Sequence, residues 1–127
     1  MNKILVVDDQ ESIQQLMKDI LTEAGYNVKC AFTGEDALEM LKKEDFHVFF
    51  IDLQLPGMDG LELCRQIRKE RIAECVYAIT GYTSIYDFLE CRKSGFDDYF
   101  PKPLDIQLIT KAADDGFEKI VRWTKEI

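Results

Sequence analysis

The sequence has no long hydrophobic run, and this absence excludes a membrane-spanning helix. Its longest uninterrupted apolar stretch is the five residues Cys75–Ile79, whereas a helix needs about 20 to cross a bilayer. The acidic pair Asp8-Asp9 comes too early to leave room for the apolar segment of a signal peptide. We therefore expect a cytoplasmic protein with no membrane partner.

Histidine and paired cysteines are equally scarce. The chain has one histidine, His47, and four cysteines with no C-x-x-C pair, so a zinc-type ligand set is excluded. Cys30 and Cys75 lie in apolar runs and are interpreted as small buried hydrophobic residues rather than redox groups. His47 stands alone before an apolar run, which favours a surface or strand-edge residue over a catalyst.

Basic residues are too few and too dispersed for a nucleic-acid surface. The chain has 16 Lys and Arg against 24 Asp and Glu, a formal net charge of −8, whereas binding to a phosphate backbone needs clustered positive charge. One basic cluster, Arg65, Arg68, Lys69 and Arg71, is interpreted as a solvated helix face because glutamates surround it. We expect no direct contact with nucleic acid.

What is present is a regular alternation of short apolar runs and amphipathic segments within a length typical of one domain, residues 1–127. Continuous apolar runs are typical of strands that are covered on both faces. The predicted strands are Ile4–Val7, Val28–Phe32, Val48–Ile51, Cys75–Ile79 and Tyr99-Phe100. Helices are predicted between them, so the fold class is α/β with a doubly wound, five-stranded parallel sheet.

The predicted helices have recognisable starts and ends. The first runs to Ala24 and stops at Gly25, the second is capped by Thr33 and runs through Lys43, and the third opens with a capping box, Asp59 and Glu62. The fourth begins after Thr83 or Ser84 and ends near Gly95. The apolar positions assigned to these helices include Ala37, Leu38, Leu41, Leu63, Cys64, Ile67, Ile85, Phe88 and Leu89.

The last helix is predicted from about Asp105 to Lys125, after Pro103. Its apolar stripe continues beyond the expected end of the sheet, so the helix is extended over 121–127. Two interpretations stay open for Trp123 and Ile127: they pack under the domain's own base, or they mark a homodimer or partner contact or the start of a linker. The stripe comprises Ile106, Ile109, Ala113, Phe117 and Ile120.

Polar residues follow four of the predicted strands: Asp8-Asp9, Asp52, Thr80 and Lys102. Because the carboxyl ends of parallel strands meet at one edge of the sheet, these residues should converge there. Three crowded carboxylates repel one another, and a hard cation such as Mg²⁺ removes that conflict. With an ammonium and a hydroxyl nearby, the set suits phosphoryl transfer to a carboxylate nucleophile.

The motifs around these residues closely resemble those of the receiver domain of two-component response regulators, chemotaxis regulators among them. The resemblance covers Ile4 to about Ile120. It implies a flavodoxin-like sheet of order 2-1-3-4-5 and a phosphorylation-dependent switch rather than an enzyme. The matching motifs are Val6-Val7-Asp8-Asp9, Asp52-Leu53-Gln54-Leu55-Pro56-Gly57-Met58-Asp59-Gly60, Ile79-Thr80-Gly81 and Gly95-Phe96-Asp97-Asp98-Tyr99-Phe100-Pro101-Lys102-Pro103-Leu104.

The resemblance implies a role for each matched position. Asp52 would accept a phosphoryl group from a phosphohistidine on a sensor histidine kinase or a phosphotransfer protein. Mg²⁺ would be bound by Asp9, by Asp52 and by the backbone carbonyl of Gln54, with Asp8 acting through a metal-bound water. Lys102 would pair with the phosphoryl oxygens.

The same resemblance implies how the signal leaves the site. Thr80 would move toward the phosphoryl group, Tyr99 would turn inward with it, and the Lys102-Pro103 bond would be cis. Binding of a downstream protein would change on the face formed by the fourth strand, the fourth helix, the fifth strand and the last helix. Candidate output residues there are Tyr82, Tyr86, Lys93, Asp97, Tyr99, Lys111 and Lys119.

Other readings of the acidic set are weaker. A phosphohydrolase with an aspartate nucleophile usually has a second aspartate two residues later, where this chain has Gln54. A flavin carrier would need a Ser/Thr-rich phosphate loop after the first strand, where Asp8-Asp9-Gln10-Glu11 would repel the phosphate. A receiver that only binds partners and no longer takes a phosphoryl group is disfavoured by the intact set of residues.

The sequence departs from the family pattern at Phe96, where a small residue is usual, and at Pro101, an uncommon residue before the lysine. Gln54 and Tyr82 occupy the two positions that tune the lifetime of the phosphoryl group in this family. Tyr82 is bulky enough to shield the phosphoryl group from water, which predicts slow self-dephosphorylation. Tyr82→Ala should accelerate the loss, measured after removal of the phosphodonor, and loss from the unmodified protein within seconds would contradict the prediction.

Overall fold

The chain alternates strand and helix from beginning to end. The structure is a computed structural model that describes residues 2–71, 74–81 and 85–125. The elements are β1 (Lys3–Val7), α1 (Glu11–Glu23), β2 (Asn27–Ala31), α2 (Gly34–Lys43), β3 (Val48–Asp52), α3 (Gly60–Glu70), β4 (Cys75–Thr80), α4 (Ile85–Ser94), β5 (Asp98–Pro101) and α5 (Ile106–Lys125). None of the described helices is long and apolar enough to cross a membrane.

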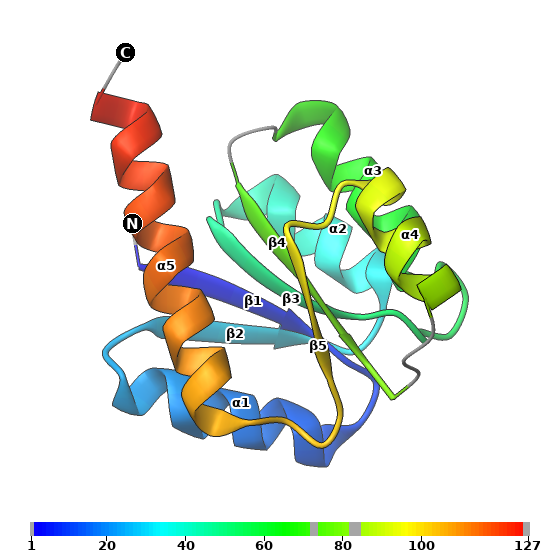
Figure 1. Cartoon of the computed structure of the whole chain (residues 1–127), viewed down its shortest axis with the longest axis horizontal. Helices are drawn as coiled ribbons and strands as arrows, with labels where there is room; N and C mark the ends of the chain where they lie inside the picture. Colours follow the sequence, from blue (N-terminus) through cyan, green and yellow to red (C-terminus); the bar gives the residue numbers. More distant parts are fainter. Residues whose placement is uncertain (1, 72–73, 82–84, 126–127) are drawn as a thin grey trace.

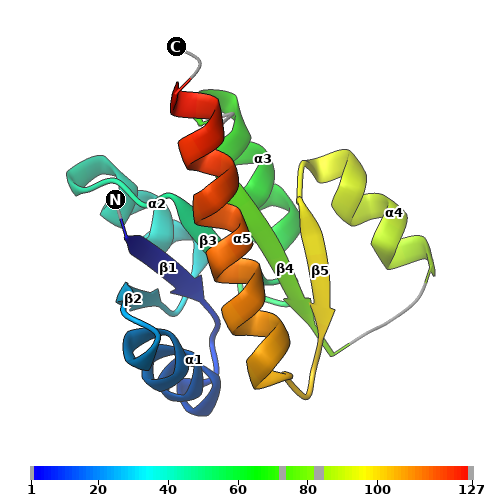
Figure 2. The same ribbon diagram turned by 60° about the vertical axis from the view of Figure 1, so that its left-hand side comes forward.

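The five strands form one parallel sheet of order β2-β1-β3-β4-β5, which confirms the predicted flavodoxin-like topology. Helices α1 and α5 cover one face, and α2, α3 and α4 cover the other (Figures 1 and 2). The carboxyl ends of β1, β3, β4 and β5 therefore lie at the same edge of the sheet, where ligands bind in open α/β folds.

The core explains why the strands are continuous apolar runs. Side chains along a strand point alternately to its two faces. Leu5 and Val7 join the cluster under α2, α3 and α4, whereas Ile4 and Val6 join the cluster under α1 and α5. Both faces of the central strands are buried, so neither set of alternate positions is polar.

The predicted helix starts are confirmed where a side chain caps them. Thr33 accepts a hydrogen bond from the backbone N–H of Asp36 at 3.0 Å, and Asp59 accepts one from that of Glu62 at 2.9 Å. The capping box is confirmed only in part, because the Glu62 carboxylate accepts from Gln66 and Arg65 rather than from the N–H of Asp59. Asp105 caps α5 by accepting from the N–H of Gln107 at 3.0 Å. Gly25, predicted to stop α1, has a φ of 100°.

Two predictions about buried helix faces are wrong. Phe88 and Leu89 on α4 are 42% and 52% exposed, because the described buried side chains of α4, Cys91 and Ser94, lie nearer its C-terminal end. Ile106 is 53% exposed in the first turn of α5, since the buried stripe begins only at Ile109. Leu38 and Leu41 on α2 are half-buried.

Trp123 is 59% exposed on the last turns of α5. Packing of this side chain under the domain's own base is therefore not seen. Ile127, the other residue of that prediction, lies outside the described residues. A partner contact at Trp123 stays a prediction.

The cysteine and histidine interpretations are confirmed in part. Cys75 is buried as expected, but Cys30 is only half-buried because β2 is an edge strand. His47 lies immediately before β3, and its Nδ1 atom is 3.1 Å from a carboxylate oxygen of Glu74.

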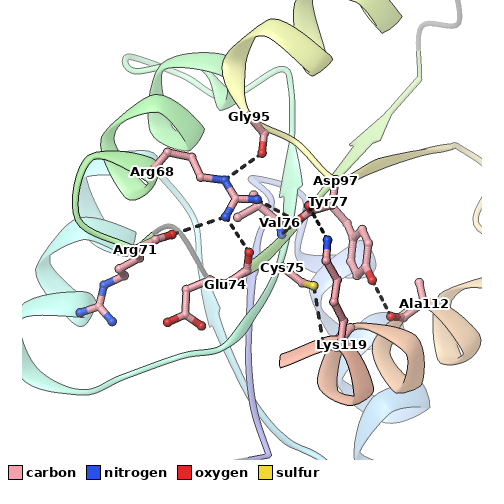
Figure 3. A network of polar contacts seen from close by, with 11 residues as sticks. Arg68, Arg71, Glu74, Cys75, Val76, Tyr77, Gly95, Asp97, Ala112 and Lys119 are labelled. Atoms are coloured by element: carbon pink, nitrogen blue, oxygen red, sulfur yellow. Dashed lines mark hydrogen bonds and ion pairs between the residues drawn. The ribbon is translucent and has the colours of Figure 1, made fainter. Parts of the chain in front are cut away.

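The interpretation of the basic cluster as a solvated face is wrong for Arg68, whose side chain is 19% exposed. Figure 3 shows its guanidinium donating to the carbonyl oxygens of Gly95 and Glu74, at 2.8 and 2.6 Å. It also pairs with Asp97 at 2.7 Å. This arginine ties α3 to the starts of β4 and β5, which a periodicity argument on one helix does not reveal.

Arg68→Ala should lower the free energy of unfolding by about 2 kcal/mol, because two partly buried carbonyls and the Asp97 carboxylate lose a donor. Arg65→Ala is the matched control on the same helix. Its ion pair with Glu62 is exposed, with side chains 46% and 44% accessible, so removal should cost less than about 0.5 kcal/mol. Urea denaturation measures both, and equal costs for the two variants would contradict the assignment.

Candidate functional site

Four strand ends bring the predicted polar residues together. Asp8 follows β1 and is fully buried, Asp52 ends β3 with 4% exposed, and Thr80 ends β4 with 1% exposed. Asp9 is the exposed member of the set. Asp8, Asp9 and Asp52 each offer a carboxylate oxygen, and these atoms lie within 4.8 Å of one another. The predicted convergence of the carboxylates is therefore present in the structure.

Lys102 brings the positive charge of the site. Its Nζ atom lies 3.1 Å from Asp8 Oδ2, 3.2 Å from Asp52 Oδ2 and 3.1 Å from Gln10 Oε1. The backbone N–H of Lys102 donates to the carbonyl of Thr80 at 2.7 Å. The Lys102-Pro103 bond is cis, as the resemblance implied. The lysine is thus held between two carboxylates from different strands.

Burial and neighbouring charges act in opposite directions on the pKa of Lys102, and both contribute to the pKa of Asp8. Burial lowers the pKa of Lys102, but the hydrogen bonds and charges of Asp8 and Asp52 outweigh it, and the pKa is raised. Burial raises the pKa of Asp8, and the neighbouring Asp52 raises it further. The N–H of Gln10 and the ammonium of Lys102 lower it, but less. The Asp8 carboxylate is therefore incompletely compensated in its ionised form.

The donor set fits a hard divalent cation. Asp8 Oδ1 accepts from the N–H of Gln10 at 2.8 Å. Asp8 Oδ2, although close to Lys102, is a buried oxygen without a well-directed hydrogen bond. Three carboxylates against one ammonium leave a local charge of −2. Oxygen ligands with this charge excess are the kind that Mg²⁺ prefers.

The loop after β3 holds Asp52 in place and carries Gln54. The N–H of Gln54 donates to Asp52 Oδ1 at 3.0 Å. At the end of this loop, a Cβ on Gly60 would lie 2.3 Å from the Asp52 carbonyl oxygen. Only glycine fits at that distance, so α3 packs directly on the backbone of Asp52. Metal binding by the Gln54 carbonyl stays a prediction.

Sequence reasoning missed two glutamines that shape the site. Gln14 is 7% exposed, and its Nε2 atom donates to the carbonyls of Asp8 and Ala31, at 2.8 and 3.1 Å. It therefore satisfies the backbone where β1 and β2 end. Its spacing from the buried Met17 and Leu21 places it on the inner face of α1, so its burial could have been predicted from the sequence. The contact of Gln10 with Lys102 could not, because no pattern in the sequence indicates it.

The predicted switch and output residues have mixed surroundings. Tyr99 is half-buried, with its ring edge-on to Phe88 at 6.0 Å between centroids. Asp97, an exposed residue predicted on the output surface, accepts from Arg68, the Val76 N–H and Lys119 (Figure 3), and its output role stays a prediction.

Other output candidates are exposed or not described. Lys111 is exposed and pairs with Asp115 at 3.0 Å, and Lys93 is exposed. Phe96, one of the family departures, is buried. Tyr82 and the side chain of Tyr86 lie outside the described residues.

Comparison with known proteins decides between the readings of this site. A family model described as the response regulator receiver domain matches residues 4–114. The chain belongs to this family. Receiver domains are phosphoacceptor switches of two-component signalling, not true enzymes, and histidine kinases are their partners. The phosphohydrolase and flavin-carrier readings are thereby excluded, and the acidic triad is typical of the Mg²⁺ site of receivers.

Solved receiver structures are similar over nearly the whole chain. The BeF3-activated receiver domain of DrrB, from Thermotoga maritima, is 34% identical with a TM-score of 0.86, covering 93% of this chain and 98% of its own. A CheY-like receiver from Methanospirillum hungatei is 31% identical with a TM-score of 0.85, covering 100% and 99%. Chemotaxis protein CheY4 of Vibrio cholerae is 30% identical with a TM-score of 0.86, covering 91% and 98%.

Asp8→Asn should stabilise the metal-free receiver at pH 7 by about 1 kcal/mol. The native carboxyl has a raised pKa, so its ionisation costs stability as the pH rises above its ordinary value of 3.8 and through the raised value. The gain in stability from Asp8→Asn should therefore vanish at acid pH, where Asp8 is protonated in both the folded and the unfolded protein. Mg²⁺ should stabilise the unmodified protein against urea but stabilise the variant much less.

Asp9→Asn is the matched control for this prediction. The Asp9 carboxylate is exposed, so the variant should lose stabilisation by Mg²⁺ without gaining stability in its absence. A metal-free Asp8→Asn protein that is less stable than the unmodified one, or a variant that Mg²⁺ stabilises equally, would contradict the account of the site's charge.

Proposed function

We propose that this receiver domain, spanning 1–127, accepts one phosphoryl group on Asp52 from the phosphohistidine of a sensor kinase or a phosphotransfer protein. One observation carries the proposal: the Lys102 ammonium lies within 3.2 Å of the buried carboxylates of both Asp8 and Asp52. Because this ammonium is shared by two carboxylates, it can pair with a phosphoryl group, which is more highly charged, once that group is attached to Asp52.

In the transfer step, a carboxylate oxygen of Asp52 attacks the phosphorus. The new O–P bond forms as the P–N bond of the phosphohistidine breaks, and the imidazole nitrogen keeps the electron pair. Lys102 neutralises charge on the phosphoryl oxygens, and its raised pKa keeps it protonated. The Gln54 N–H holds the carboxylate in position through Asp52 Oδ1.

Mg²⁺ would be held by Asp9, Asp52 and the carbonyl of Gln54, with Asp8 contributing through a bound water. When present, the ion neutralises part of the charge on the carboxylates and the phosphoryl oxygens. The buried Asp8 Oδ2 atom supports this assignment, because the ammonium of Lys102, 3.1 Å away, is shared with Asp52 and leaves part of the carboxylate charge for a metal-bound water and its cation.

Thr80 and Tyr99 are proposed to turn phosphorylation into a change of surface. Thr80 ends β4 beside the site, and its carbonyl is already bonded to the Lys102 N–H. Tyr99 lies on the neighbouring strand, half-buried against Phe88 of α4. Phosphorylation would favour an arrangement in which Thr80 moves toward the phosphoryl group and Tyr99 turns inward.

The surface that changes is the one formed by β4, α4, β5 and α5. It carries the exposed apolar side chains of Phe88, Leu89 and Leu108, which a downstream protein can cover. We propose that phosphorylation sets the affinity of this surface for that protein.

Incubation with acetyl phosphate and Mg²⁺, followed by intact mass measurement, tests the phosphoacceptor assignment. The unmodified protein should gain one phosphoryl group, and Asp52→Asn should gain none. Asp45→Asn is the control, because that carboxylate is exposed and pairs with Arg71 away from the site; it should be phosphorylated normally. No addition with any donor, including a phosphohistidine protein, would instead support a receiver that only binds partners.

A further inference from the structure

Gln10 occupies the N-cap of α1, but its side chain does not cap the helix. N-cap positions favour Ser, Thr, Asp and Asn, whose short side chains accept from the first free N–H groups. Gln10 Oε1 instead lies 3.1 Å from Lys102 Nζ. Its backbone is fixed, because its N–H donates to Asp8 Oδ1 and its carbonyl accepts from the N–H of Gln14. The side chain is thus directed into the site from a rigid support.

The chemistry of the contact determines which way the amide faces. An ammonium group only donates hydrogen bonds, so the oxygen of Gln10 must face Lys102. The Nε2 group, with two N–H donors, then lies on the other side of the amide. Gln10 is exposed, and Nε2 has no acceptor among residues 2–71, 74–81 and 85–125. An accessible, unused donor therefore sits beside the lysine.

We propose that Gln10 Nε2 donates a hydrogen bond to the phosphoryl group on Asp52, which makes Gln10 a phosphoryl-binding residue. The inference rests on Asp52 being the phosphoacceptor. Lys102 Nζ lies 3.1 Å from Gln10 Oε1 and 3.2 Å from Asp52 Oδ2, so the amide and the carboxylate flank the same ammonium. A phosphoryl group built on Asp52 extends its oxygens toward both. A neutral donor at this place adds a hydrogen bond without a further charge.

The alternative is that Gln10 only braces Lys102 through its oxygen. The two roles predict opposite results for Gln10→Glu. That variant keeps an oxygen for Lys102 but replaces the N–H donors by a second, negatively charged acceptor. If Gln10 only braces Lys102, Gln10→Glu should hold the ammonium as well as glutamine does, or better. If Gln10 donates to the phosphoryl group, the variant loses that hydrogen bond, and its carboxylate repels the phosphoryl oxygens.

The test measures binding of beryllofluoride, a phosphoryl mimic, at saturating Mg²⁺, together with the rate of phosphorylation by acetyl phosphate. Gln10→Ala should weaken beryllofluoride binding about tenfold, the loss of one hydrogen bond to a charged group. Gln10→Glu should weaken it further. Mg²⁺ affinity, measured separately by calorimetry, should fall in neither variant, which excludes an indirect effect through the metal.

Gln15 supplies matched controls on the same helix. It is exposed, and its Nε2 donates to Asp19 at 2.7 Å away from the site. Gln15→Ala and Gln15→Glu should bind beryllofluoride like the unmodified protein. Unchanged or tighter binding in Gln10→Ala, or binding in Gln10→Glu equal to that of the unmodified protein, would overturn the inference. Failure of the phosphoacceptor assignment is distinct, because the unmodified protein itself would then neither bind beryllofluoride nor take a phosphoryl group.

Discussion

The sharing of one ammonium by two buried carboxylates is the constraint on which the rest of the site depends. Lys102 lies within 3.2 Å of both Asp8 and Asp52, and with Asp9 beside them the charges do not balance. A fold tolerates such an excess of buried negative charge only where a bound ligand can neutralise it. The parallel sheet creates it, because every strand releases its next residue at the same edge.

Contacts that stabilise the fold lie at the amino ends of the strands, and the functional site lies at their carboxyl ends. At the amino ends of β4 and β5, Arg68 and Asp97 bond to each other and to backbone groups, and Lys119 adds a second cation from α5 (Figure 3). At the carboxyl ends, the described residues place three carboxylates around the ammonium of Lys102. Helix α4 follows β4 at the carboxyl ends of the strands, where the carboxylates crowd. It ends next to Gly95, at the amino ends of the strands, where the charged groups are paired. Charge changes in the site are thus placed beside a helix that is anchored at its far end.

Much of this arrangement was predictable from the sequence, for physical reasons. Short apolar runs such as Ile4–Val7, alternating with amphipathic segments, are typical of strands buried on both faces, and the ends of these strands locate Asp8, Asp52 and Lys102. A helix cap such as Thr33 depends only on residues close to it in sequence, and this cap was predicted correctly.

The errors concern contacts between elements that are distant in sequence. Whether Phe88 faces inward depends on where α4 crosses its neighbours, and whether Arg68 is solvated depends on the turn after α4, 27 residues away. Gln10 reaches Lys102 across 92 residues. Polar side chains of this kind carry no periodic signal, because their partners come from other strands.

Chemical identification of the phosphorylated residue tests the central claim most directly. After incubation with acetyl phosphate and Mg²⁺, borohydride reduces an aspartyl phosphate to homoserine, and peptide mass spectrometry locates the change. We expect homoserine at position 52 alone, dependent on Mg²⁺ and abolished by Lys102→Met. Homoserine at position 8 or 9, or modification of position 52 that is independent of Mg²⁺ and of Lys102, would contradict it.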